Sequence, residues 1–267
     1  MASIAGRVEG AAVRPEKFFL YSAIAMTAVI VAGFSVQLAM GRSSFASPLL
    51  VHAHAVVFMG WVTINLLQNI FVVAGQRTLH RLLGWIAAGW IVAMVVLGCA
   101  VTVAMARSGQ VPFFFRPQHF LVFDPMSLFG FVGLTVAAIG LRRRTQWHRR
   151  LHYCAMSMLL GPGFGRLLPM PMLAPWAFEA TFAAVMIFPV IGVIADRRRR
   201  GAAHPAWKWG IGTMVVTMAL TEAITYSPIG GAIYRSVTAG SPGAEVAPLV
   251  FPPPPAGPRI TGRGPGS

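Results

Sequence analysis

Histidines near the ends of apolar segments are the side chains of this sequence best suited to chemistry. Six of the seven histidines share this setting: His52, His54, His80, His119, His148 and His152. A neutral imidazole binds transition metals through a ring nitrogen, and two imidazoles from facing helices can hold the iron of a b-type haem. The alternative is that histidines at a membrane interface bond helix ends and lipid headgroups without any cofactor.

A second set of candidates is charged. Asp124, Arg166, Glu179 and Glu222 each fall inside an apolar segment. Charged side chains are costly inside a bilayer, so they are functional candidates by default. Three carboxylates and one arginine at a similar depth could bind a metal or solute or relay protons. They could equally form a static ion pair, Arg166 with Asp124 or Glu179, that only holds helices together.

Seven long apolar segments must position these side chains. They are Phe18–Met40, Leu49–Gly75, Leu82–Met105, His119–Leu141, Leu151–Leu168, Trp176–Ile194 and Trp209–Tyr226. Each is close to the roughly 20 residues that a helix needs to cross a bilayer core. Backbone groups in lipid must bond to one another, so the segments are expected to be helices. The predicted fold is an all-α, polytopic bundle of seven spans.

Composition and charge agree with a membrane protein. Hydrophobic residues make up 56% of the chain and charged residues 11%, against about 25% charged in a soluble domain. In the seven-span topology, seven basic residues fall on or near one side: Arg42, Arg107, Arg116, Arg166, Arg235, Arg259 and Arg263. The remaining fifteen of the 22 Lys and Arg residues fall on the other side. This asymmetry predicts a cytoplasmic N-terminus and an extracytoplasmic C-terminus, with the lipid bilayer rather than nucleic acid as partner.

Three regions follow from this topology. Residues 1–17 form a polar cytoplasmic arm, residues 18–226 the membrane domain, and residues 227–267 a tail rich in Gly, Pro and Ser. Such a tail buries too little apolar surface to offset the entropy of ordering, so we expect it to be disordered. Within the fifth span, Gly161-Pro162-Gly163 predicts a kink, because proline cannot donate its helical hydrogen bond.

The histidines can be paired by depth and by span. The second and fourth spans supply an outer pair, His54 (or the adjacent His52) with His119. The third and fifth supply an inner pair, His80 with His148 or His152, which lie four residues apart on one helix face. This arrangement, with histidines on four successive spans and ligands paired from alternate spans, resembles the ascorbate-reducible transmembrane b-type cytochromes over roughly residues 50–155. That resemblance implies two bis-histidine haem b sites and a role in electron transfer.

Other residues are similar to a group of uncharacterised bacterial multi-spanning membrane proteins. The resemblance covers most of the membrane domain. It rests on His54 with Trp61 and Gln68, Arg77-x-x-His80-Arg81-x-x-Gly84-Trp85, His148-Arg149-x-Leu151, Arg166, and His204-Pro205 with Trp209-Gly210. It implies fold and a location in the bacterial cytoplasmic (inner) membrane, and no activity.

The sequence thus favours a haem-binding redox or electron-transfer subunit, with haem between the second and fifth spans. One alternative is a non-redox carrier or sensor that uses the four charged residues, Asp124, Arg166, Glu179 and Glu222, which all lie on the outer half of the membrane. A membrane subunit whose polar residues are purely structural is another. No sequence motif assigns catalytic residues or a separate metal site.

Overall fold

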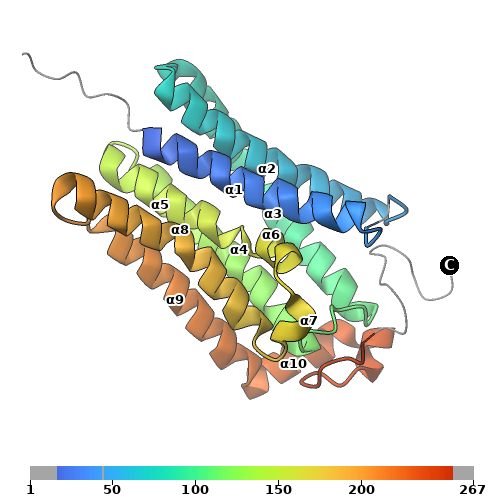
Figure 1. The fold of residues 1–267 in the computed structure, drawn as a ribbon. Helices are drawn as coiled ribbons and strands as arrows, with labels where there is room; N and C mark the ends of the chain where they lie inside the picture. The colour runs from blue at the N-terminus through green and yellow to red at the C-terminus, as the bar shows by residue number, and fades with distance from the viewer. Residues whose placement is uncertain (1–16, 44, 255–267) are drawn as a thin grey trace, which may run out of the picture.

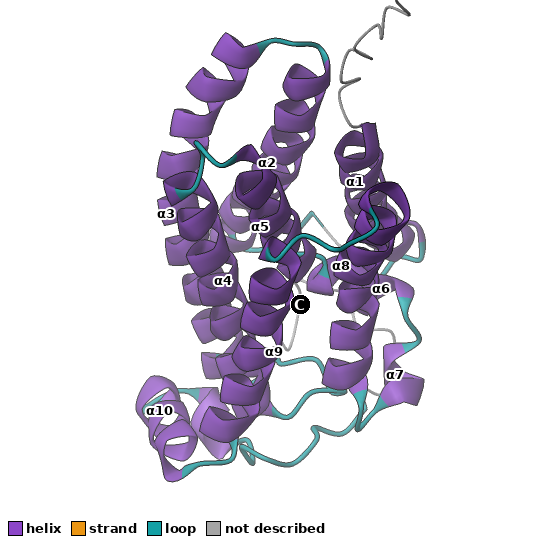
Figure 2. Ribbon diagram, turned by 90° about the vertical axis from the view of Figure 1, so that its left-hand side faces the viewer, coloured by secondary structure: helices purple, strands orange, loops and turns teal. Residues whose placement is uncertain are grey.

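The computed structural model describes residues 17–43 and 45–254, and within them it is helical and contains no strand (Figure 2). The helices are α1 (Lys17–Ala39), α2 (Leu49–Val73), α3 (Arg77–Arg107), α4 (Pro117–Gly140), α5 (Thr145–Met158), α6 (Gly161–Leu167), α7 (Met170–Leu173), α8 (Ala177–Arg200), α9 (Ala206–Thr225) and α10 (Pro228–Thr238), followed by the short 3₁₀ helix η1 (Pro242–Glu245).

Five helices, α1, α2, α3, α4 and α8, are long and apolar enough to cross a membrane. Large apolar side chains such as Val92, Val96 and Ile86 on α3 are exposed, as expected of a surface that meets lipid. The chain therefore has the helices of an integral membrane protein. The full count of seven spans and the orientation remain predictions, because α5 has only 14 residues and α9 is not among these five helices.

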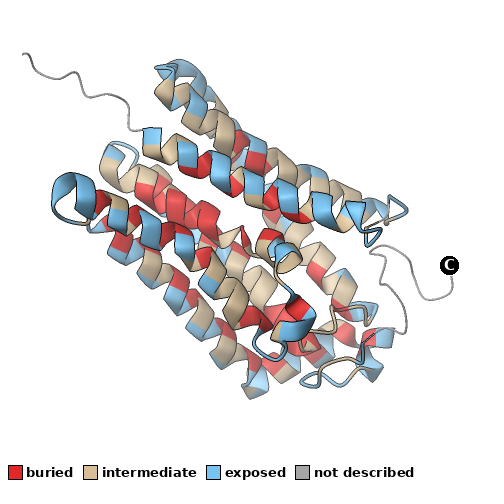
Figure 3. Ribbon diagram, in the orientation of Figure 1, coloured by how far each residue is buried: buried red, intermediate tan, exposed pale blue. Residues whose placement is uncertain are grey.

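Consecutive helices form antiparallel hairpins, α2 with α3, α4 with α5, and α8 with α9 (Figure 1). Helices α1, α3, α5 and α9 begin at the same end of the bundle, where α2, α4 and α8 finish; we call this the basic end. Buried side chains concentrate on α4 and α5 at the centre (Figure 3). Fully buried Phe131 and Met94 lie in this core.

The predicted kink lies where the fifth span is interrupted. Helix α5 ends at Met158 and α6 restarts at Gly161, with Pro162 in its first turn. The short helix α6 packs closely on α1, since a Cβ at Gly33 would lie only 2.6 Å from the carbonyl oxygen of Gly163. The segment after the break therefore forms a close crossing with α1.

The expected disorder of residues 227–267 is wrong for residues 227–254, and residues 255–267 lie outside the described part. Helix α10 begins at Pro228, where the Ser227 hydroxyl accepts a hydrogen bond from the Gly230 amide at 3.4 Å. The Tyr234 hydroxyl, whose pKa is raised by burial, donates to the Gly243 carbonyl at 3.0 Å. Buried Tyr234 and Thr238 lie on one face of α10, and Tyr234 packs with Ala106 of α3 and Leu121 of α4, which explains the folding of α10 despite the Gly- and Pro-rich composition.

Candidate functional site

Three histidines meet between α3 and α5 near the basic end, and we call them the histidine cluster: His80, His148 and His152. The ring centroids of His80 and His148 are 6.2 Å apart, and those of His148 and His152 are 4.7 Å apart. His80 lies one turn into α3, and the other two lie on one face of α5, as their spacing predicts. All three are half-buried, so the cluster reaches the side of the bundle.

The hydrogen bond of His148 defines its protonation. Its Nδ1 lies 2.8 Å from the carbonyl oxygen of Ala138, near the end of α4. A carbonyl can only accept, so Nδ1 carries the hydrogen and Nε2 of the neutral ring keeps its lone pair. This is the arrangement that orients metal-binding histidines in proteins. The buried Nδ1 of His80 has no hydrogen-bond partner among the described residues.

The predicted outer pair does not converge in the same way. The His54 ring stacks on Phe58 at 4.2 Å, and its buried Nδ1 has no partner in the described part of the chain. The His119 ring packs against Phe178 at 4.6 Å, and its Nε2 lies 3.0 Å from Glu222 Oε1. No ring contact joins His54 and His119 within the described ranges, so similar depth has not brought the two side chains together.

The charged residues fall into two groups. Asp124 accepts a hydrogen bond from the Thr102 hydroxyl at 3.3 Å and interacts electrostatically with Arg166. Arg166 nevertheless donates to the Pro162 carbonyl at 2.9 Å and lies 4.0 Å from the ring centroid of Phe34. Neither Asp124 nor Glu179 forms a direct ion pair with Arg166 in the described chain. The short helix α6 directs this guanidinium toward α1 instead.

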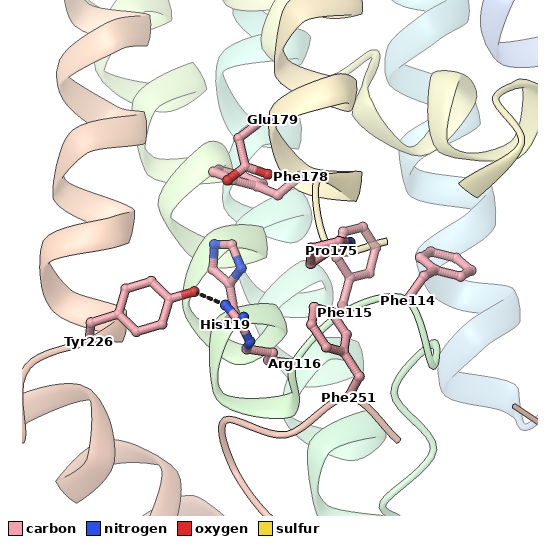
Figure 4. Close-up of a pocket in the computed structure, with 9 residues that line it drawn as sticks. All are labelled: Phe114, Phe115, Arg116, His119, Pro175, Phe178, Glu179, Tyr226 and Phe251. Carbon is pink, nitrogen blue, oxygen red and sulfur yellow. Dashed lines mark hydrogen bonds between the residues drawn. The ribbon is translucent and has the colours of Figure 1, made fainter. Parts of the chain in front are cut away.

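Glu179, Glu222 and His119 form the second group, beside a small pocket at the end of the bundle opposite the basic end (Figure 4). The pocket has a volume of about 20 Å³, enough for one water molecule or a similarly small ion. Its lining consists of Phe114, Phe115, Arg116, His119, Pro175, Phe178, Glu179, Tyr226 and Phe251. Arg116 hydrogen-bonds the Tyr226 hydroxyl and lies over the Phe251 ring, so the C-terminal segment closes one side.

The structure contains a buried ion pair near the basic end that the sequence did not predict. Arg150 on α5 is fully buried, and Asp196 on α8 is 3% exposed. Arg150 donates from Nε to Oδ2 at 2.7 Å and from Nη2 to Oδ1 at 2.6 Å, a bidentate geometry. Trp207 Nε1 on α9 donates to the same carboxylate at 2.8 Å. Asp196 precedes four consecutive arginines, and this isolated acidic residue was the available sequence signal.

The loop between α8 and α9 also contacts this carboxylate. The backbone amide of His204 donates to Asp196 Oδ2 at 3.3 Å. Burial and the neighbouring Arg150 charge lower the pKa of His204 below its usual range. Its neutral ring can therefore accept, through Nδ1, the hydrogen bond from the Ala206 amide at 3.1 Å. The ion pair thus joins α5, α8, α9 and the connecting loop.

Protein-family models, curated proteins and solved structures contain no match to this chain. Within the described residues, no three His, Cys, Asp or Glu side chains are grouped as ligands of a metal ion. A haem iron needs only two protein ligands, so this finding does not bear on the histidine cluster.

Proposed function

We propose that the protein is a membrane-embedded haem b protein that transfers electrons, with His80 and His148 as the two axial ligands. The observation that carries this proposal is the separation of the two rings, 6.2 Å between centroids. A metal about 2 Å from one nitrogen of each imidazole would separate the centroids by about 6 Å. The rings are nearly perpendicular, at 86°, so they do not stack on each other.

The hydrogen bonds of the cluster support the same assignment. His148 presents an unprotonated Nε2 because its Nδ1 is bound to a carbonyl, and His80 keeps a buried nitrogen without a partner. His152 is the third ring of the cluster and would pack beside the haem ligand rather than bind the iron. A bound haem would supply one-electron transfer, while the protein orients the ligands and sets the polarity around them.

This proposal retains one haem of the two suggested by the sequence. His54 and His119 lack the ring contact of the inner pair, so no outer haem is included. We place the protein in the bacterial cytoplasmic membrane, with the basic end toward the cytoplasm, on the positive-inside rule. The haem would then lie near the cytoplasmic surface, accessible to a soluble electron donor.

The test is an absorbance spectrum of protein expressed with haem supplied and then purified. Reduction should give the narrow visible bands of low-spin, bis-imidazole iron. His80→Ala and His148→Ala should each lose haem or become high-spin, because one axial position opens. His152→Ala should keep a low-spin spectrum. His52→Ala is the matched control, since His52 lies on α2 outside the cluster and contacts the Phe45 carbonyl at 3.0 Å. A colourless wild-type protein would refute the proposal.

A second candidate is a carrier or sensor that uses the pocket beside Glu179. Its support is a close pair of polar atoms, His119 Nε2 and Glu222 Oε1, which lie 3.0 Å apart. Despite this distance, neither atom makes a hydrogen bond in the described chain. A single small ion or a proton would fit the cavity. The test is thermal stability in a series of monovalent cations: wild type should respond to one of them, and Glu179→Gln and Glu222→Gln should not.

A further inference from the structure

Three arginines converge on a single neutral acceptor where α1, α5 and α8 meet at the basic end. The side-chain oxygen of Gln146 accepts from Arg150 Nη1 at 2.6 Å and from Arg200 Nη1 at 3.1 Å. Arg149 donates to the same oxygen through Nη2. Guanidinium groups repel one another, so their convergence on an amide oxygen indicates a site organised for negative charge.

The charge around this junction is strongly positive. Asp196 already pairs with Arg150 at 2.6 Å and lies 3.9 Å from Arg200 Nε, and it is the acidic residue of the described chain at this end. The segments expected at the basic end carry fifteen Lys and Arg residues, against Glu9, Glu16 and Asp196. The excess remains large even if every one of these carboxylates is paired. An anion entering the junction would therefore meet a favourable potential.

Aromatic rings hold two of the guanidiniums in place. Arg199 lies over the Phe18 ring at 4.6 Å from its centroid, and Arg149 lies over the Phe19 ring at 4.8 Å. Both phenylalanines belong to the first turn of α1. Cation–π contact fixes the plane of a guanidinium and still allows its N–H groups to donate at the edge. The donors are thus preorganised at the depth where a helix leaves the bilayer.

We propose that this junction, formed by Gln146, Arg149, Arg199 and Arg200, binds the phosphate group of an anionic phospholipid. Arginine is suited to phosphate because its fork of donors matches two phosphate oxygens. A lipid is favoured over a soluble anion because the junction lies where α1 begins and α8 ends, and both helices are long and apolar enough to cross a membrane. A phosphate bound there would lie at the depth of the lipid headgroups. Exposed apolar side chains near the junction, such as Tyr21 on α1 and Ile191 on α8, would contact the acyl chains.

The test measures lipid binding by native mass spectrometry of the full chain, released from nanodiscs of phosphatidylglycerol and phosphatidylcholine. Wild type should retain phosphatidylglycerol preferentially. Arg149→Gln/Arg199→Gln removes two charge-assisted donors and should weaken that binding about 100-fold. Arg199→Gln alone, at an exposed position that should not affect folding, should weaken it about tenfold. The matched control, Arg142→Gln/Arg143→Gln, makes the same charge change at the same end outside the junction and should lose much less.

Two outcomes would overturn the proposal. Equal losses in the two double variants would mean that binding reflects the overall charge of the basic end rather than this junction. A second experiment adds inorganic phosphate to the protein in neutral detergent and measures thermal unfolding. Phosphate at millimolar concentration that displaces phosphatidylglycerol and stabilises wild type equally well would assign the site to a soluble anion. Stabilisation by phosphatidylglycerol alone supports the lipid.

Discussion

Removal of one partner from the Arg150–Asp196 ion pair should destabilise the protein strongly. In Asp196→Leu, the fully buried guanidinium of Arg150 loses both of its carboxylate hydrogen bonds. Breaking a buried pair in this way costs about 3–5 kcal/mol in soluble proteins. Arg150 would keep its bonds to Gln146, at 2.9 Å to the carbonyl and 2.6 Å to the side chain. Those contacts place the expected loss near the lower limit, about 3 kcal/mol.

The assay is thermal unfolding of the purified protein in one detergent. About 3 kcal/mol corresponds to a fall in Tm of roughly 6–12 °C for a chain of this size. Trp207→Phe removes only the indole donor at 2.8 Å and should cost about 1.5–3 kcal/mol. Asp196→Asn preserves the shape and part of the hydrogen bonding, so its loss should lie below that of Asp196→Leu.

A double-mutant cycle tests the reasoning itself. Arg150→Met leaves the Asp196 carboxylate buried with the Trp207 and His204 donors, and should also be destabilised. Combining Arg150→Met with Asp196→Leu removes both charges, and an apolar pair of similar volume is often as stable as the ion pair it replaces. The double variant should therefore be more stable than the sum of the single losses by at least about 1 kcal/mol. Additive losses would show that the two side chains do not stabilise each other.

Three further outcomes are expected. Gly33→Ala should lower Tm, because its Cβ would lie 2.6 Å from the backbone of α6. Gly133→Ala, with open space around the Cβ, should raise Tm slightly through helix propensity. Equal effects of the two substitutions would contradict the close α1–α6 crossing. Arg166→Leu combined with Asp124→Asn should give nearly additive changes in Tm, because the two charged side chains are not in direct contact. A strong rescue in the double variant would show that they form a direct ion pair. A reporter inserted between α4 and α5 should be cytoplasmic and one at the C-terminus extracytoplasmic; the reverse at either site would refute the predicted topology.

For most ends of the long helices, the position predicted from hydropathy is within a few residues of the observed one. The first predicted span, Phe18–Met40, corresponds to α1 at Lys17–Ala39. The third, Leu82–Met105, is longer in the structure, because polar Arg77–Arg81 continues the helix as the first turn of α3. Apolar length sets the part of a helix that meets lipid, whereas the end is set by local bonding, such as the left-handed turn at Gly75.

Helix α10 shows where composition was misleading. The average over residues 227–267 is dominated by Gly, Pro and Ser, which favours disorder. Within it, Ser227 and Pro228 form a helix start, and Tyr234 and Thr238 share one buried face four residues apart. A window of eleven residues would have revealed this amphipathic pattern, which the longer average concealed.

The sites were predicted only as far as spacing along one helix allows. His148 and His152 were expected on one face of α5, and their rings lie 4.7 Å apart. His54 and His119 were matched by depth, but depth does not define the direction in which a side chain points around its helix axis. Arg150 and Asp196 were missed for the same reason, since their contact depends on how α5 and α8 are rotated against each other.

That rotation connects the ion pair with the proposed haem ligand. Residues two apart on a helix point about 200° away from each other, so Arg150 faces away from His148 and, on the next turn, from His152. The bidentate bond to Asp196 and the indole of Trp207 hold one side of α5 against α8 and α9. His148 and His152 therefore lie on the opposite side of α5, where the His148 ring approaches His80 of α3. The buried ion pair thus favours the rotation of α5 that brings these histidines toward His80, although it contacts no histidine side chain in the cluster.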